Sequence, residues 1–245
     1  MIWRVEHLAT VDSTNSRLAE AARHGVPEGH VIIADYQSAG RGRLDRTWLS
    51  VPGSSFLCSI LLRPALSPQE LQLAVVAVAL AARAALVRLS GVRPQLKWPN
   101  DLVVDDVKLG GLLAELIGGT TNGVVVGVGI NLTSTPPDFV ATCVRDLAGV
   151  TITPLALLDL VLEELEPRRM QLDSEDGRQA LRTEYQSSLC TLGRVVKIEL
   201  FDRTVVGHAR SVDPEGRLEV EVDGSSEFFS AGDVVHLRID EGSTL

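Results

Sequence analysis

The stretch KWPNDLVVDDVKLGGLLAEL, residues 97–116, decides how the middle of the chain folds. Pro99 cannot pair in a sheet through its own nitrogen, and Asn100 and Asp101 are typical turn residues. We therefore expect a bend at this point, followed by a strand-like run over residues 101–118. The bend places polar side chains at the junction of two apolar segments.

Lys108 lies inside this run, just before the glycine pair Gly110 and Gly111. One interpretation is a lysine at a strand edge that discourages aggregation. The other is a positive charge beside a bound ligand, because glycines allow a ligand to approach the backbone closely. The stretch alone leaves both interpretations open.

A second unusual stretch, YQSAGRGRLDRTW, covers residues 36–48. Gly40 and Gly42 interrupt any helix or strand, so the stretch is predicted to be a flexible loop. The loop carries three cations, Arg41, Arg43 and Arg46. Guanidinium groups match phosphate and carboxylate, which predicts a lid over an anionic ligand. The alternative is an ordinary solvated surface loop.

The flanking segments alternate between strand and helix signals. A helix is expected after Asp12 or Ser13 as the capping residue, with Gly25 as its stop. Strands are expected at His30–Gln37 and in SSFLCSILLRP after the loop, and a long buried helix over 68–89. Two further helices are expected in TPLALLDLVLEELEPRRMQL and DGRQALRTEYQSSL.

Valines and glycines alternate over 124–130, just before Asn131. The glycines at 127 and 129 suggest that another backbone or a ligand comes close to this strand. At the other end of the chain, short alternating segments from residue 193 onward predict a small β-barrel of about 50 residues. We expect a domain boundary near residue 191.

The composition excludes several classes of protein. The formal net charge is −9, which argues against a general nucleic-acid-binding surface. Three scattered cysteines suggest neither a disulfide framework nor a zinc site and fit a reducing cytoplasm. The apolar run at 73–82 is too short to span a bilayer, and the N-terminus lacks a signal-peptide core. We expect no nucleic acid and no membrane as partners.

The chain lacks the Walker-type phosphate loop, the dinucleotide-binding fingerprint, the hydrolase nucleophile elbow and metal-ligand histidine spacing. Five places in the sequence still contain polar residues that packing or turn formation does not explain. These are residues 13–15 (STN), Gln37 with the arginine loop, residues 97–101 (KWPND), Lys108, and Asn131. Helix capping alone would explain residues 13–15.

Taken in order, STN, YQSAGRGRLDRTW, KWPNDLVVDDVKLGGLLAEL and GVGIN resemble the biotin protein ligases, from about residue 10 to residue 135. The resemblance implies an α+β fold, with a mixed β-sheet and flanking helices like those of class II aminoacyl-tRNA synthetases. It also implies a small C-terminal SH3-like β-barrel. The expected domains are residues 1–190, which bind biotin and ATP, and residues 191–245.

The resemblance further implies a two-step reaction in the cytoplasm. Biotin is activated by MgATP as biotinyl-5′-AMP and then transferred to a lysine of a biotin carboxyl carrier protein domain, such as that of acetyl-CoA carboxylase. ATP and biotin are the implied substrates, Mg²⁺ the implied metal, and a homodimer a possible assembly. Because STN begins soon after Met1, we expect no DNA-binding domain before it, and hence a monofunctional ligase.

Site residues are implied only where this chain matches the family motifs. The implied biotin-binding residues are Ser13, Thr14, Asn15, Gln37, Arg41, Arg43, Gly110, Gly111 and Leu112. The implied ATP and adenylate contacts are Gly40, Arg41, Arg43, Arg46, Trp48, Asn100, Lys108 and Asn131, with Asn100 also near the magnesium ion. The implied catalytic residues are Lys108, Arg43 and Asp101.

Lys108 would bridge the biotin carboxyl group and the α-phosphate. Asp101 would help to place the triphosphate or orient the carrier lysine. Leu44 and Asp45 stand where longer family loops carry another basic residue, which leaves the detailed lid contacts open.

Two other functions remain as alternatives. Lipoate or octanoate ligases and transferases have a similar catalytic fold and also acylate a carrier lysine, but GRGR and KWPND favour biotin. A non-catalytic module that binds biotin or a nucleotide would be expected to lack Lys108 or Arg43, and both are present.

Overall fold

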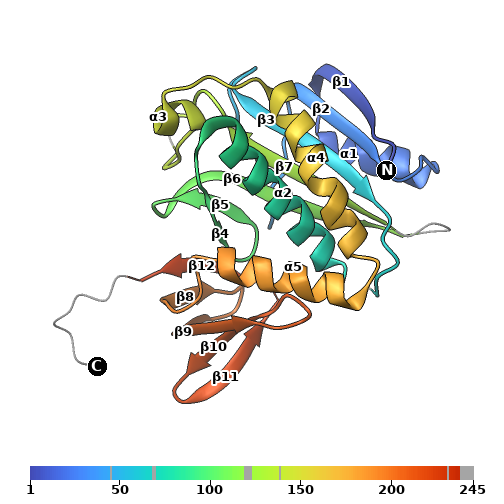
Figure 1. Cartoon of the computed structure of the whole chain (residues 1–245). Helices are drawn as coiled ribbons and strands as arrows, with labels where there is room; N and C mark the ends of the chain where they lie inside the picture. The colour runs from blue at the N-terminus through green and yellow to red at the C-terminus, as the bar shows by residue number, and fades with distance from the viewer. Residues whose placement is uncertain (45, 68–69, 119–122, 138, 231, 238–245) are drawn as a thin grey trace.

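The computed structural model describes the whole chain except residues 45, 68–69, 119–122, 138, 231 and 238–245. The described part contains a seven-stranded mixed sheet with helices on both faces and a separate five-stranded antiparallel sheet at the C-terminal end (Figure 1). This architecture confirms the expected α+β class.

The strands of the large sheet lie in the order β1-β2-β3-β7-β6-β5-β4. Only β1 and β2 pair in parallel, whereas all other neighbours are antiparallel, so the sheet is mixed as predicted. The strands are β1 (Arg4–Val11), β2 (His30–Gln37), β3 (Ser55–Leu62), β4 (Gln95–Lys97), β5 (Asp101–Val104), β6 (Val107–Ile117) and β7 (Gly123–Asn131). Strand β3 is buried along its whole length, so it forms the centre of the fold.

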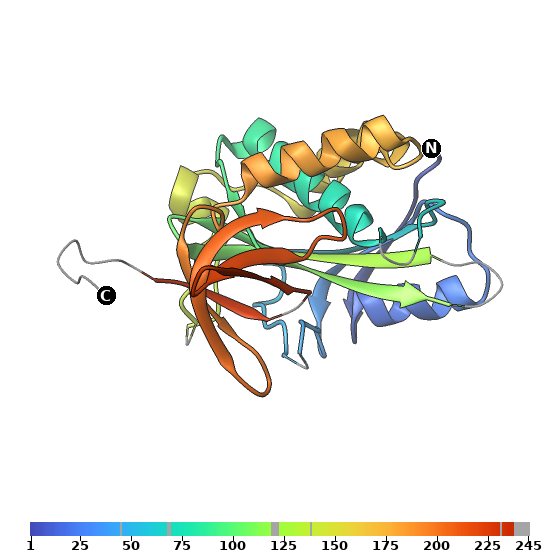
Figure 2. The same cartoon turned by 90° about the horizontal axis from the view of Figure 1, so that it is seen from below.

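The helices divide between the two faces of this sheet. Seen from below, α2 (Gln72–Ser90), α4 (Pro154–Gln171) and α5 (Glu175–Ser188) lie on one side and α1 (Thr14–Arg23) lies on the other (Figure 2). A short helix, α3 (Val144–Ala148), follows the loop after β7. Burial of apolar side chains between these layers supplies most of the driving force for folding.

Helix α2 is apolar around most of its circumference because the sheet, α4 and α5 surround it. It begins at Gln72, so the predicted start at residue 68 was too early; residues 68–69 lie outside the described part. By length and composition alone, α2 is apolar enough to cross a membrane, but 67% of its apolar window is buried inside the protein. Its environment is therefore that of a core helix.

The run predicted as one strand over 101–118 is a hairpin of two strands, β5 and β6. Asp105 and Asp106 have φ values of 50° and 64°, both in the left-handed region. Two consecutive left-handed residues reverse the chain within a tight turn, and aspartate tolerates that conformation better than most residues. The prediction was wrong because apolar patterning continues on both sides of the turn.

The small sheet has the strand order β11-β10-β9-β8-β12. Its strands are β8 (Val195–Glu199), β9 (Thr204–Val212), β10 (Leu218–Val222), β11 (Ser225–Phe229) and β12 (Asp233–His236). Its buried side chains belong to the same continuous hydrophobic core as those of the large sheet. The two sheets are thus packed together around one hydrophobic core.

Trp98 explains how the small sheet is attached. Its side chain is only 2% exposed, and its Nε1 donates a 3.0 Å hydrogen bond to the carbonyl of Gly216 in the small sheet. The Trp98 backbone nitrogen also donates to Thr191 Oγ1 at 3.0 Å. The tryptophan of KWPND is therefore a structural residue that joins the two sheets.

Candidate functional site

A cavity of about 330 Å³ opens between the N-terminus of α1, the arginine loop, β6, β7 and the loop that follows β7. Most of the residues predicted from the motifs lie around it, although they come from five separate segments. Those lining it are Ser13, Thr14, Asn15, Gln37, Arg41, Arg43, Arg46, Trp48, Asn100, Asp101, Lys108, Gly111, Leu112 and Asn131. Gly40 and Gly110 do not line it.

The start of α1 supplies the first polar wall. Ser13 caps the helix, since its side chain accepts a bond from the backbone nitrogen of Ser16. The backbone nitrogen of Thr14 donates to Gln37 Oε1 at 2.8 Å, and the Thr14 hydroxyl oxygen lies 3.0 Å from the same atom. Capping therefore explains Ser13 in part, but it does not explain the contact from Thr14 to β2.

The glycines of β7 leave room for side chains of the site. The side chain of Asn15 is buried and donates to the carbonyl of Leu113 at 3.2 Å. A Cβ atom at Gly127 would lie 2.2 Å from Asn15 Oδ1, and one at Gly129 would lie 2.6 Å from the Trp48 ring. The sequence predicted a backbone or a ligand close to these glycines, whereas the groups that approach them are the side chains of Asn15 and Trp48.

The arginine loop, called the lid below, is folded back on itself. Arg41 and Thr47 form an isolated antiparallel bridge, and the Gly42 nitrogen donates to the Arg46 carbonyl at 2.7 Å. A Cβ atom at Gly40 would lie 2.5 Å from the Trp48 carbonyl. Gly40 is therefore required by the close approach of the lid's two arms.

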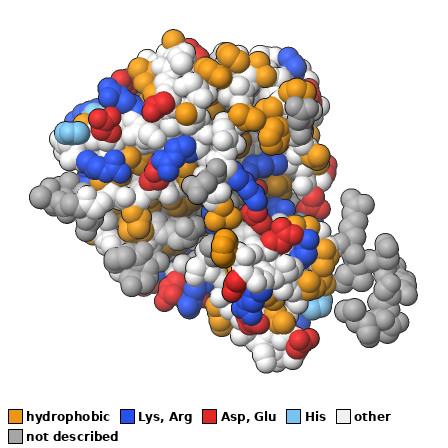
Figure 3. Space-filling model, turned by 180° about the vertical axis from the view of Figure 1, so that it is seen from behind, with side chains coloured by type: hydrophobic (Ala, Val, Ile, Leu, Met, Phe, Trp, Pro, Cys, Tyr) orange, Lys and Arg blue, Asp and Glu red, His pale blue; other side chains and the backbone are white. Residues whose placement is uncertain are grey.

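Three of the four cations around the cavity are paired with carboxylates. Arg41 Nη1 lies 2.6 Å from Glu115 Oε1, and Lys108 Nζ lies 2.7 Å from Asp101 Oδ1. Arg46 is paired with Asp233 of β12. On the face shown in Figure 3, Lys and Arg side chains lie beside Asp and Glu side chains, in keeping with such pairing.

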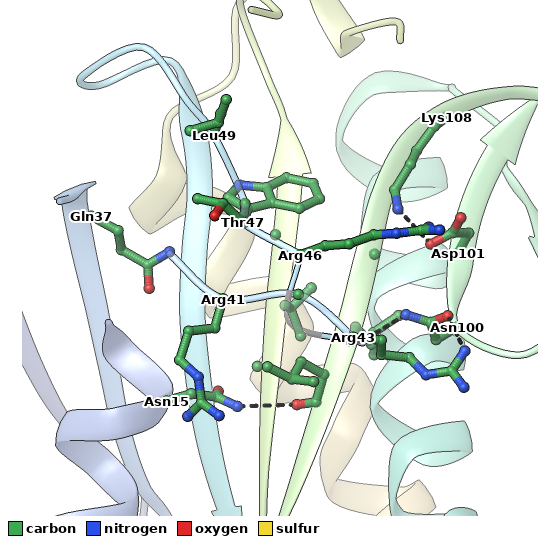
Figure 4. Close-up of a pocket in the computed structure, with 18 of the residues that line it drawn as sticks. Asn15, Gln37, Arg41, Arg43, Arg46, Thr47, Leu49, Asn100, Asp101 and Lys108 are labelled. Atoms are coloured by element: carbon green, nitrogen blue, oxygen red, sulfur yellow. Dashed lines mark hydrogen bonds and ion pairs between the residues drawn. The ribbon is translucent and has the colours of Figure 1, made fainter. Parts of the chain in front are cut away.

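Arg43 differs from the other three cations. Its Nη1 donates to the neutral amide oxygen of Asn100 at 3.1 Å, and among the described residues no carboxylate lies within ion-pair distance (Figure 4). Burial lowers the pKa of Arg43 by desolvation, an effect partly offset by Asp233 and Asp101. A half-buried guanidinium without an anionic partner is well placed to bind an anion from a ligand.

Lys108 and Trp48 line another part of the cavity. The Lys108 ammonium lies 5.8 Å from the centre of the Trp48 ring, within cation–π distance. The Lys108 carbonyl accepts a 2.8 Å bond from the nitrogen of Thr142, so the loop after β7 holds the lysine backbone in place. Lys108 is thus fixed at the cavity, and a simple strand-edge role does not account for it.

Two predicted residues have contacts that are structural. Asn131 is buried and its Nδ2 donates to the carbonyl of Thr142 at 3.1 Å, which ties the end of β7 to the following loop. A Cβ atom at Gly110 would lie 2.6 Å from the carbonyl of Gly129, so this glycine allows β6 and β7 to pair closely.

Sequence reasoning missed several residues of the site. Glu115 and Asp233 were not predicted because their arginine partners lie far away in the sequence. Phe139, 55% exposed, lines the cavity from the loop after β7. Cys58 also lines it, but burial raises the pKa of its thiol, which therefore stays neutral and is no nucleophile.

Asp106, Cys190 and His236 lie close enough together to suggest a metal site away from the cavity. Arg194 Nη1, however, lies 2.9 and 2.8 Å from the two Asp106 carboxylate oxygens and 3.1 Å from His236 Nδ1. A guanidinium therefore occupies the position that a cation would take. The cluster joins the β5–β6 turn to the small sheet.

Comparison with known proteins gives two family matches. Residues 8–131 match the biotin/lipoate A/B protein ligase family, and residues 191–237 match the biotin protein ligase C-terminal domain. The first match contains every motif around the cavity except Asp233 and the loop after β7, and the second contains the small sheet.

Individual proteins are similar along nearly the whole chain. A biotin–[acetyl-CoA-carboxylase] ligase of Mycobacterium tuberculosis is 36% identical over 96% of this chain and 90% of its own length. The bifunctional ligase/repressor of Bacillus subtilis is 29% identical, and 70% of its length is covered. Among solved structures, the Aquifex aeolicus biotin protein ligase in complex with biotin and ATP is 27% identical, with a TM-score of 0.82 over 97% of this chain and all of that chain.

Proposed function

Because the chain belongs to the biotin/lipoate A/B protein ligase family, and within it to the biotin protein ligases, we propose that it attaches biotin to a carrier protein at the expense of ATP. In the first step a biotin carboxylate oxygen attacks the α-phosphorus of ATP, giving biotinyl-5′-AMP and pyrophosphate. In the second step a lysine amine attacks the acyl carbon, an amide forms and AMP leaves.

The polar wall at α1 suits the ring end of biotin. Ser13, Thr14 and Gln37 carry the hydrogen-bonding groups that a cyclic urea requires, and the backbone around Gly111 and Leu112 borders the same space. Val128 and the glycines of β7 line the same cavity and offer apolar surface to the rest of the ligand. Biotin would therefore lie with its ring at α1 and its carboxylate toward Lys108.

The observation that carries the proposal is that Lys108 and Arg43 both line the same cavity; in the proposal the adenylate lies between them. Negative charge develops on the carboxylate oxygen and the α-phosphate as they join, and two fixed cations stabilise it. Arg43 lacks a carboxylate partner in the described structure, and Lys108 would exchange Asp101 for the ligand. Asp101, once released, would orient the carrier lysine.

The lid would close the site by exchanging partners. Arg41 and Arg46 are bound to Glu115 and Asp233 in the structure, and phosphate competes for such forked donors. Trp48 offers its ring to the adenine, with Asn131 holding the end of β7 nearby. Closure excludes water from the mixed anhydride, which would otherwise hydrolyse.

Magnesium fits this site because carboxylate oxygens line it. Asp101 and Asp233 are the acidic residues of the cavity, and Mg²⁺ is commonly held by one or two carboxylates together with substrate phosphates. Asn100, suggested from the sequence, uses its amide oxygen for Arg43, so it reaches an ion only if Arg43 turns away. The ion would neutralise the triphosphate while the protein's own cations act on the α-phosphate.

The partner follows from the chemistry of the product. We place a biotin carboxyl carrier domain, such as that of acetyl-CoA carboxylase, at the open side of the cavity, and the reaction in the cytoplasm, with a homodimer as the possible assembly. The boundary between residues 190 and 191 is supported by the start of the C-terminal family match at residue 191. The small sheet contributes Asp233 to the cavity from across this boundary.

Exchange of labelled pyrophosphate into ATP tests the first step. Exchange should require biotin, because only the adenylate-forming step returns label to ATP. Lipoate should not replace biotin, since its ring has no N–H groups for the wall at α1. Exchange that proceeds with lipoate but not with biotin would assign the chain to the lipoyl branch of the family.

A further inference from the structure

Ser59 lies at the centre of β3, directly beneath the start of α1, and its side chain is completely buried. Its hydroxyl oxygen is 2.8 Å from Thr14 Oγ1 and 2.6 Å from Asn15 Oδ1. No family motif quoted above includes it, and it does not line the cavity. In the described structure its hydroxyl is hydrogen-bonded to Thr14 and Asn15, which belong to the polar wall at the start of α1, called the ligand wall below.

The two amides of this network can be oriented without ambiguity. Gln37 Oε1 accepts from the Thr14 backbone nitrogen, which can only donate, so the oxygen end of Gln37 faces Thr14. Asn15 Nδ2 donates to the Leu113 carbonyl, which can only accept, so the oxygen end of Asn15 faces Ser59. Ser59 must therefore give its single hydroxyl proton to Asn15 Oδ1.

The number of hydroxyl protons in the network then determines where the Thr14 hydroxyl proton points. Three oxygen–oxygen contacts join Gln37, Thr14, Ser59 and Asn15, but only the two hydroxyls bring protons to them. Ser59 uses its own proton on Asn15, so the Thr14 proton fills the 2.8 Å contact with Ser59, which is shorter than the 3.0 Å contact with Gln37. The Thr14 oxygen consequently offers only lone pairs to the cavity.

We propose that Ser59 is a positioning residue that makes Thr14 an obligate hydrogen-bond acceptor and so selects ligands whose ring presents an N–H group. This inference rests on the proposed function and deepens it. A cyclic urea supplies the N–H donor that Thr14 requires, whereas a dithiolane ring supplies none. Ser59 thereby contributes to the choice of biotin without touching it.

Substitution of Ser59 by alanine tests this role. The change leaves Asn15 Oδ1 without its donor and frees the Thr14 proton to turn toward the ligand. The dissociation constant for biotin, measured by calorimetry, should rise roughly five- to a hundredfold, the range expected for an unsatisfied buried acceptor. The dissociation constant for MgATP should stay within about twofold, because the adenylate side of the cavity is unchanged.

Discrimination between two biotin analogues is a measurement that a purely structural role of Ser59 would not change. Each is a cyclic carbamate in which one urea N–H is replaced by oxygen. The parent protein should discriminate strongly against the carbamate whose oxygen faces Thr14. In the S59A variant this discrimination should fall several-fold, because Thr14 can then donate to that oxygen.

Ser55 provides the matched control. It lies four residues earlier on β3, is equally buried, and its hydroxyl lies 3.4 Å from Ser54 and not near the ligand wall. The S55A variant should bind biotin and both carbamates like the parent. Parent-like biotin affinity and discrimination in S59A would overturn the inference, as would an equal loss for biotin and MgATP. Failure of the parent to bind biotin would instead refute the proposed function.

Discussion

Lys108 Nζ lies 2.7 Å from Asp101 Oδ1, across the hairpin formed by β5 and β6. Both residues line the cavity (Figure 4). The lysine ammonium also lies 5.8 Å from the centre of the Trp48 ring. The pair keeps a compact positive charge in place next to a carboxylate that an anionic ligand can displace. We regard this displacement as the first event of the reaction.

Substituting Lys108 by alanine should therefore reduce biotin-dependent pyrophosphate exchange by roughly a hundredfold or more, as for loss of one preorganised electrostatic group. The thermal unfolding midpoint should change little, because the lysine side chain is 41% exposed. Normal exchange in this variant would exclude the proposed role.

Ligands should protect the lid from trypsin. Without ligand, we expect cleavage after Arg41, Arg43 or Arg46, since surface ion pairs hold a loop only weakly. Biotin with MgATP should suppress these cuts, whereas cleavage after Arg203, exposed in the small sheet, should continue unchanged. Mass spectrometry of the fragments locates each cut, and equal lid cleavage with and without ligands would make the loop an ordinary surface feature.

Substituting Arg43 by alanine should increase escape of the adenylate more than it impairs its formation. Lys108 would still act on the first step, but the half-buried guanidinium that we propose retains the adenylate would be lost. Biotinyl-AMP released into solution acylates exposed lysines, so labelling of serum albumin should rise several-fold above the parent. The R203A variant serves as the control. If albumin labelling stays at the parent level while the variant still makes biotinyl-AMP, retention of the adenylate must be assigned to Arg41 and Trp48 instead.

His236 should make the stability of the protein depend on pH. Burial lowers the pKa of His236, with a smaller opposing effect from Asp106, so the unfolded chain binds the proton more tightly than the folded protein. The stability contributed by the neutral ring is present above the unfolded pKa of about 6.5 and is lost as the pH falls toward the folded value. Substituting His236 by glutamine should flatten the decrease in unfolding midpoint between pH 7 and pH 5.

A pH dependence that the glutamine substitution leaves unchanged would point to another group, such as Asp106 beside His236. If the glutamine variant loses stability as steeply as the parent, carboxylates dominate this pH range. Asp106, whose pKa is lowered chiefly by its hydrogen bonds from Arg194, loses its contribution only as the pH falls through its own, more acidic folded value. Unfolding followed from pH 5 downward in a D106N variant would separate the two groups.

Local signals predicted the parts of the fold that depend on neighbouring residues. The strand His30–Gln37 has the predicted bounds, and Ser13 is the helix cap, because both follow from short-range propensity and capping chemistry. The β5–β6 turn was missed because apolar patterning does not reveal two left-handed aspartates. Trp98 could be understood only from the fold, since its partner Gly216 lies 118 residues away.

The same distinction applies to the site. The motif order predicted many of the residues that line the cavity. It did not identify Glu115, Asp233 or Ser59, which are recognised only through contacts across the fold. Gly40 and Gly110 were expected beside ligand, whereas their closest neighbours are the protein's own backbone. A glycine in the sequence indicates a close neighbour, but it does not distinguish a ligand from the protein's own backbone or side chains.

The most direct test of the central claim is the mass of a carrier domain after incubation with the protein, biotin and MgATP. The account predicts a gain of one biotin on the wild-type acceptor, located at its acceptor lysine, and no gain when that lysine is replaced by arginine or when ATP is omitted. An acceptor whose mass is unchanged while the protein still forms biotinyl-AMP, or one that gains lipoate in place of biotin, would contradict it.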